Sequence, residues 1–319
     1  MLKKLAAVLL SLVAVVSFSA FSNSPSDNPT ESKIKISVSF DAMKELVEAV
    51  GRDKVEVSTI ISVGMEAHDF EPKAQDLVNL STAQIFVYNG LGMEGWADEA
   101  ISAADNASLI VVDASTGADL IERETLSEDH DEDAHHHEDP DHETGHHHHG
   151  KYDPHLWLGL RGAQTQAENI KNALVQADSA NKEYYEQNFN AFAAELEKLY
   201  KEYSGKFEAA PKKSFVTGHA AFGYLCRDFG LEQNSIRDIF AEGEPSAQQL
   251  AQLVEYCREN NVTTIFAEEM VSPAVSQTLA NEVGAKVEII YTMENAQDGM
   301  TYLERMESNL SKIYDSLTK

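Results

Sequence analysis

The sequence predicts an α/β protein of two lobes, each a mainly parallel sheet flanked by helices, joined by one long rigid helix. Short β-like runs alternate with helical segments in both halves of the chain, which is typical of parallel sheets covered by helices. A continuous helical pattern at 181–208 separates the two series. Such a helix would span about 40 Å, enough to run across two lobes. The 319 residues suffice for two medium domains.

The first lobe is predicted at 33–180. Ile34–Val38 alternates with a period of two, and Asp41 is placed to cap a helix that ends at Gly51. The remaining predicted elements of this lobe are strands at 55–61, 84–88 and 109–113 and helices at 73–80 and 163–176.

The second lobe is predicted at 209–319. Ser246 and Gln249 have the spacing of a capping box, and Ser272 precedes a proline at a first helical position. The predicted elements are strands at 214–217, 236–239, 263–267 and 287–290, and helices through Cys226, from Ser246, at 272–283 and at 300–317.

Residues 1–22 have the pattern of a secretory signal peptide, with a basic start, an apolar stretch and small residues at the end. The apolar stretch is shorter than the ~20 residues that a membrane span needs. Residues 23–32 are polar and are interpreted as a flexible tether. We therefore expect an exported protein.

The composition limits the classes of partner. The chain has 53 acidic and 25 basic side chains and a formal net charge of -28, which argues against nucleic acid and anionic lipid. Its two cysteines, Cys226 and Cys257, exclude a disulfide-dense scaffold and a four-cysteine zinc module. Both lie on helical patterns, where a buried thiol is expected and a disulfide between them is the alternative.

Histidine is distributed unevenly. Of 12 histidines, 9 lie within 121–150, together with 11 acidic residues and few apolar ones. Such a segment cannot bury enough apolar surface to offset its ordering entropy, so a disordered surface loop is predicted. We interpret it as a weak, multivalent zinc collector, with a solvated linker as the alternative.

The other three histidines are His68, His155 and His219. Each falls on a connection, and two lie beside predicted strand ends, where open α/β sheets bind ligands. A lone histidine is more often a hydrogen-bonded core or surface residue. Three on connections, in a chain that also has a histidine-rich tract, favour a metal site.

Four segments carry a family resemblance: GMEAHDFEP at 64–72, YNGLGMEGW at 88–96, DPHLW at 153–157 and GHAAFGY at 218–224. In this order they resemble segments of the metal-binding proteins that feed ABC transporters, most closely the zinc-uptake (ZnuA/AdcA-like) branch. The resemblance covers about residues 33–318. It implies two α/β lobes, a rigid helical connection and one metal ion in the cleft.

The resemblance also implies a ligand set. His68, His155 and His219 match the family's three histidines, and Glu294 is the favoured fourth ligand. Glu268, Glu66 and water are the alternatives, and Tyr291 stands where many members have Asp. Three imidazoles and a carboxylate or water suit zinc. The related manganese proteins replace one histidine by a carboxylate, so His219 favours zinc.

By this resemblance the protein is not an enzyme. It would be a monomer that captures Zn2+ as its transported substrate and passes it to the membrane permease of an ABC transporter, at the cell surface or in the periplasm. Phe21 stands where many relatives carry a lipid-modified Cys, which leaves a lipid anchor open. The alternatives are a secreted zinc-dependent hydrolase and a manganese-binding member of the same family.

Overall fold

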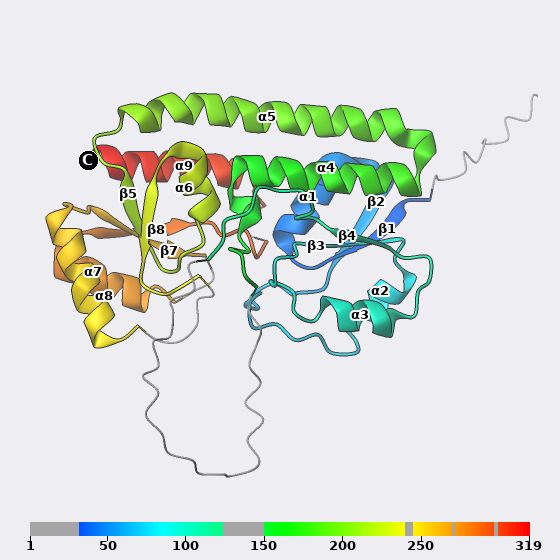
Figure 1. Cartoon of the computed structure of the whole chain (residues 1–319), viewed down its shortest axis with the longest axis horizontal. Coiled ribbons are helices and arrows are strands. Elements are labelled where there is room, and N and C mark those ends of the chain that lie inside the picture. The colour runs from blue at the N-terminus through cyan, green and yellow to red at the C-terminus, as the bar shows by residue number, and fades with distance from the viewer. Residues whose placement is uncertain (1–31, 124–149, 240–244, 270–271, 297–298) are drawn as a thin grey trace, which may run out of the picture. The chain divides into compact units, whose positions relative to one another are not determined.

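The computed structural model describes residues 32–123, 150–239, 245–269, 272–296 and 299–319 (Figure 1). The predicted signal peptide, all of the predicted tether except Ser32, and 124–149 of the predicted loop lie outside these residues. Lys33–Lys319 pack together as one unit.

The first lobe is built on four parallel strands in the order β2-β1-β3-β4. Helices lie on both faces of this sheet, with α1 and α4 on one and α2 and α3 on the other (Figure 1). The strands are β1 (Ile34–Val38), β2 (Val55–Thr59), β3 (Ile85–Tyr88) and β4 (Ile110–Asp113). The helices are α1 (Asp41–Gly51), η1 (Arg52–Lys54), α2 (Val78–Thr82), α3 (Ala97–Ala104), η2 (Leu156–Leu158) and α4 (Leu160–Ala177).

The second lobe repeats this plan, with four parallel strands in the order β6-β5-β7-β8. Its strands are β5 (Ser214–Thr217), β6 (Glu232–Ser235), β7 (Thr264–Glu268) and β8 (Lys286–Ile290). Its helices are α6 (Gly223–Phe229), α7 (Ala247–Glu259), α8 (Ala274–Val283) and α9 (Tyr302–Thr318). The predicted fold class is therefore confirmed.

One long helix joins the lobes. After the short turn η3 (Ser179–Asn181), α5 runs over 28 residues from Lys182 to Ala209 and passes above both sheets (Figure 1). Its buried side chains recur every three or four residues, as expected for a helix that packs along one face: Tyr185, Phe189, Phe192, Leu196, Leu199, Tyr203 and Phe207. The C-terminal helix α9 lies beside α5, and its first residues contact α1 of the first lobe, whereas the last residue of the chain, Lys319, lies at the second lobe (Figure 1).

Several local predictions are corrected by tertiary contacts. Asp41 does not cap α1, because it is the first helical residue and its carboxylate pairs with Arg305. Ser272 does not cap α8 either, since Pro273 occupies the N-cap position and α8 begins at Ala274. The capping box of Ser246 and Gln249 is confirmed.

Two element boundaries also differ. The edge strand β6 lies at Glu232–Ser235, before the predicted 236–239, because its polar sequence pairs with β5 while Ile236 packs into the core behind it. The helix predicted at 73–80 begins only at Val78. The preceding residues form turns in which Asp76 accepts a hydrogen bond from the Lys73 backbone. The amphipathic helix α3 was not predicted.

The two cysteines are buried free thiols in different parts of the core. Cys226 belongs to the large apolar cluster that continues from the first lobe along α5 and α9. Cys257 belongs to a smaller cluster beneath α7 and α8. Burial raises the pKa of Cys257 to about 11. Burial and the absence of a disulfide indicate that both cysteines are packing residues.

Among the described residues, none of the helices combines the length and apolar character needed to cross a membrane.

Candidate metal site

The structure brings together four side chains that are far apart in the sequence. His68 lies in the connection after β2, and His155 immediately precedes η2. His219 is the second residue after β5, and Glu294 follows β8. One ligand atom from each lies within 4.8 Å of one atom from every other member. This is the one such group of His, Cys, Asp and Glu found in the part of the chain that the structure describes. It contains all four residues favoured from the sequence.

The three imidazoles face one another. Nε2 of His68 lies 3.2 Å from Nε2 of His155, and His219 contacts both rings, with ring centroids 6.0 Å from His68 and 5.3 Å from His155. His155, His219 and Glu294 are buried and His68 is half-buried. The cluster is therefore nearly enclosed, with His68 on its more open side.

Asp153 orients His155. Its Oδ1 lies 2.9 Å from both the backbone nitrogen and Nδ1 of His155, so Nδ1 is assigned as the protonated nitrogen and Nε2 keeps its lone pair. Burial, with a further contribution from His219, lowers the pKa of His155 well below its usual value, so the ring is neutral. Burial raises the pKa of Asp153 to about 7, and a bound cation nearby would favour its ionised form.

Glu268 supports His219 from the end of β7. Its Oε1 accepts a 2.9 Å hydrogen bond from the backbone N–H of His219 and lies 3.5 Å from Nδ1 of that ring. A Cβ atom at Gly218 would overlap the Glu268 carboxylate, so glycine is required for this approach. Burial opposes ionisation of Glu268, but its interactions with His219 hold the pKa below its usual value. Its carboxylate thus lies behind His219 and outside the group of four.

Glu294 lies on the inner side of a small cavity of about 230 Å³ formed by both lobes. Burial raises the pKa of Glu294 well above its usual value, and the nearby carboxylates of Glu66 and Glu269 add to this rise. Glu66 is exposed and lines the same cavity, so it is placed at the opening of the site.

Some buried polar atoms of this cluster have no hydrogen-bond partner among the described residues. Neither ring nitrogen of His219 has a hydrogen-bond partner among the described residues, nor has Oε1 of Glu294. Leaving such atoms unpaired is costly in a folded protein. Neutral imidazole nitrogens and a carboxylate oxygen facing one point are the donor set that a divalent metal ion would satisfy.

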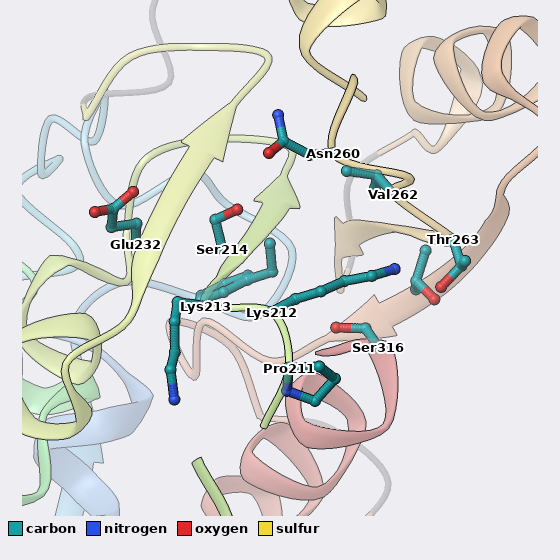
Figure 2. Close-up of a pocket in the computed structure, with 11 residues that line it drawn as sticks. Pro211, Lys212, Lys213, Ser214, Glu232, Asn260, Val262, Thr263 and Ser316 are labelled. Atoms are coloured by element: carbon teal, nitrogen blue, oxygen red, sulfur yellow. The ribbon is translucent and has the colours of Figure 1, made fainter. Parts of the chain in front are cut away.

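A second pocket, of about 310 Å³, lies at the start of β5 (Figure 2). Two of its polar side chains already bind other parts of the protein. Lys212 Nζ donates to the carbonyl oxygens of Asn261 and Lys319, and Ser214 contacts the Tyr256 hydroxyl. Among the described residues, Glu232 is its one lining residue of the His, Cys, Asp and Glu types, so the pocket has no ligand cluster comparable to the metal site.

Two similar α/β lobes, a long helix between them and an enclosed cluster of three histidines and a carboxylate define a metal-binding protein of the solute-binding class. The family model for the zinc-uptake complex component A, periplasmic (ZnuA), matches residues 36–316. The chain therefore belongs to the ZnuA family, a family of zinc-uptake solute-binding proteins of ABC transporters.

Individual relatives agree with this assignment. The chain is 43% identical over 298 residues to a Treponema pallidum (strain Nichols) protein described in terms of metal binding, covering 93% of this chain and 91% of that protein. It is 38% identical to the high-affinity zinc uptake system protein ZnuA of Bacillus subtilis (strain 168), covering 99% of both. The structure of Streptococcus pneumoniae AdcAII superposes with a TM-score of 0.77 at 33% identity, covering 90% of this chain and 100% of that one.

Two supporting carboxylates were not predicted in these roles: Asp153 orients His155, and Glu268 holds the backbone of His219. Glu268 was weighed as a ligand, whereas the structure places its carboxylate against the backbone of His219. The role of Asp153 could have been predicted from its position, because an Asp two residues before a candidate histidine ligand can accept a hydrogen bond from the imidazole. For Glu268 no such signal existed, because it is 49 residues from His219.

Proposed function

We propose that this protein captures Zn2+ between its lobes and delivers it to the membrane permease of an ABC transporter, without catalysing a reaction. His68, His155, His219 and Glu294 are the proposed ligands. The carrying observation is that one ligand atom from each residue lies within 4.8 Å of those of the others, while Nε2 of His219 and Oε1 of Glu294 have no hydrogen-bond partner among the described residues.

The donor set supports zinc. Zinc favours four ligands in a tetrahedron at about 2.0–2.2 Å, which separates two ligand atoms by about 3.4 Å. The 3.2 Å between the Nε2 atoms of His68 and His155 already matches this separation. A separation at the 4.8 Å limit of the group would shorten by about 1.4 Å on binding. Manganese prefers more oxygen ligands than this site offers. Zinc is also supported by a relative, because one solved structure of Streptococcus pneumoniae AdcAII is described as Zn(II)-bound.

Four protein ligands also favour transport over hydrolysis. A catalytic zinc keeps one position open for water, whereas the Glu294 carboxylate would complete the tetrahedron here. The proposal includes export by the signal peptide at 1–22, the tether at 23–32, and a monomer whose lobes are bounded at 33–180 and 209–319 with the connecting helix at 181–208.

The site is tested by zinc titration calorimetry on metal-stripped protein without residues 124–149, in which His68→Ala, His155→Ala, His219→Ala and Glu294→Gln are compared. We expect one tight site in the parent. Each substitution should weaken it by more than the 10–100-fold typical of losing an outer partner of a ligand. Glu232→Gln, an exposed change beside the pocket in Figure 2, should leave the affinity unchanged. The proposal would be wrong if the parent protein had no tight zinc site, or if the histidine substitutions left its zinc affinity unchanged.

Delivery is tested separately by uptake of radiolabelled zinc into cells at limiting zinc. Loss of this protein should abolish the uptake, and the wild type should restore it where His219→Ala does not. Uptake that persists without the protein would contradict the delivery role.

A further inference from the structure

A buried ion cluster lies behind the segment that carries Glu294. Arg305 on α9 is fully buried, and its Nη2 donates to Oδ2 of Asp41 at 2.7 Å and lies 3.8 Å from Oε1 of Glu45. Both carboxylates belong to α1 of the first lobe. We call Asp41, Glu45 and Arg305 the Arg305 cluster, and residues 291–295 the Glu294 segment.

The Arg305 cluster holds the backbone of the Glu294 segment at two consecutive carbonyl groups. Arg305 Nη1 donates to the carbonyl oxygen of Asn295 at 2.9 Å. The backbone N–H of Asp41 donates to the carbonyl oxygen of Glu294 at 3.3 Å. Asp41 and Arg305 are also hydrogen-bonded to each other, so the pair holds the peptide between Glu294 and Asn295 from two points.

The other side of the Glu294 segment is held as well. Glu269 accepts hydrogen bonds from the backbone N–H groups of Thr292 and Met293, both at 2.7 Å. Trp157 Nε1 donates to the carbonyl oxygen of Thr292 at 2.7 Å. Met293 has a φ of 63°, a left-handed conformation that is unfavourable for an L-residue with a side chain. Surrounding contacts must therefore impose the path of this segment.

We propose that Asp41 and Arg305 are positioning residues for the Glu294 ligand, which they hold in place from the first lobe. This inference rests on the proposed function, in which Glu294 binds zinc. Although Glu294 follows a strand of the second lobe, its backbone is fastened to α1. His68 and His155 also come from the first lobe, so His219 becomes the one proposed ligand held by the second lobe alone.

The chemistry of the cluster favours such a role. Buried ion pairs contribute little net stability compared with apolar side chains of the same size, because both charges lose their hydration. Nε of Arg305 also has no hydrogen-bond partner among the described residues. We therefore assign the cluster the role of fixing the position of the Glu294 ligand.

The test is a double-mutant cycle on zinc affinity, measured by chelator competition on the full metal-stripped chain. Asp41→Asn is made in the wild type and in a Glu294→Gln background. In the wild type it should weaken zinc binding about 10–100-fold, as loss of an outer partner of a ligand does. In the Glu294→Gln background the loss should shrink to less than about threefold, since the ligand it positions is gone.

Two further measurements keep the proposal falsifiable. Asp41→Asn leaves the buried Arg305 with only the more distant carboxylate of Glu45, so the paired variant Asp41→Asn with Arg305→Gln removes the charges of Asp41 and Arg305 together and repeats the cycle. With Co2+ in place of zinc, both variants should shift the visible spectrum toward that of Glu294→Gln. Asp178→Asn is the matched control, because its carboxylate binds Asn181 and Tyr185 at the turn between α4 and α5 and has no contact with the site.

Three results would each overturn the positioning role. They are equal losses of zinc affinity in the two backgrounds, an unshifted Co2+ spectrum, and an Asp41→Asn change in the wild type that leaves zinc affinity unaltered. These outcomes differ from failure of the proposed function. That failure would appear as a parent protein without a tight site, or as indifference to His219→Ala.

Discussion

Asp153 Oδ1 and His155 Nδ1 lie 2.9 Å apart, within a segment whose backbone is itself held by the hydroxyl of Tyr224. The pair directs the unprotonated Nε2 of His155 toward His68. A metal-binding histidine commonly donates its other N–H to a carboxylate, which fixes the ring and raises its basicity. The same principle extends to His219, where Glu268 holds the backbone beside the ring.

Removing the carboxylate of Asp153 should weaken zinc binding without removing a ligand. We expect Asp153→Ala to lower the affinity about 10–100-fold, because His155 loses the acceptor that orients it. Competition with a chelator of known affinity measures the change. Asp113→Ala is the control, since Asp113 Oδ1 binds Ser115 and no histidine. An unchanged affinity in Asp153→Ala would show that His155 is oriented by packing alone.

Glu268 and Glu294 should differ in the size of their effects. Glu268→Gln keeps an oxygen for the His219 backbone, so the loss should stay within the 10–100-fold range of an outer partner. Glu294→Gln should cost more, because it removes a charged ligand. Calorimetric titration of both variants with zinc decides between them. A loss in Glu268→Gln as large as that in His219→Ala would make Glu268 the fourth ligand.

A methyl group at position 218 should disturb the site through Glu268. The Cβ of Gly218→Ala would occupy the place of the Glu268 carboxylate, which must then move away from His219. We expect a loss of zinc affinity of about tenfold or more. Gly205→Ala is the matched control, because nothing lies within 4 Å of a Cβ on this residue of α5. There the change should stabilise the helix by roughly 0.5–1 kcal/mol and leave zinc affinity alone. Equal affinities in the two variants would contradict the argument.

Glu94 should make the stability of the metal-free protein depend on pH. Its carboxylate accepts hydrogen bonds from the backbones of Asn89 and Gly90, yet burial raises its pKa from 4.5 to about 7. The folded state therefore holds this proton more tightly than the unfolded chain does. The contribution is fully present below pH 4.5 and is lost as the pH rises to about 7.

The measurement is urea unfolding of wild type and Glu94→Gln across this pH range. The amide is expected to destabilise the fold at every pH, since it cannot accept both backbone hydrogen bonds. The diagnostic is the change with pH. The free energy of unfolding of the wild type should fall by about 3 kcal/mol relative to the variant from acid to neutral pH. Parallel curves would refute the assignment.

Excising the histidine-rich residues 124–149 should leave the fold and the tight site intact. The flanks are already joined, because Glu122 and Tyr152 form an antiparallel bridge and Arg123 donates to the Lys151 carbonyl at 3.0 Å. A short Gly-Ser linker can therefore close the gap at small entropic cost.

Zinc stoichiometry by calorimetry should fall from several sites to one on this excision, with the tight affinity unchanged. A solved ZnuA relative with an internal deletion is described with zinc bound. If the excised protein loses the tight site, the histidine-rich segment contributes ligands. If the stoichiometry of the full chain is already one, the segment is not a zinc collector.

Much of this protein could be predicted locally. Periodicity located most strands and helices, because a strand of period two and a helix of period 3.6 record their buried faces within a few residues. The failure at Asp41 has a long-range cause. A capping residue is recognised from its neighbours, whereas Asp41 is taken up by Arg305, 264 residues away. The short helix α2 was misplaced for a local reason, since a turn at Lys73 competes with it.

The sequence by itself determined the two-lobed α/β class, the long connecting helix and the three histidines as a candidate set. Each of these can be recognised from neighbouring residues or from short sequence motifs. Only the tertiary structure decided which carboxylate faces them. Glu66, Glu268 and Glu294 all lie at or after the carboxyl ends of parallel strands. The order of elements along the chain does not rank them, although the family resemblance favours Glu294. Their positions differ only when both lobes are packed, because Glu268 then bonds the His219 backbone and Glu66 is exposed, while a Glu294 oxygen lies within 4.8 Å of a nitrogen of each histidine.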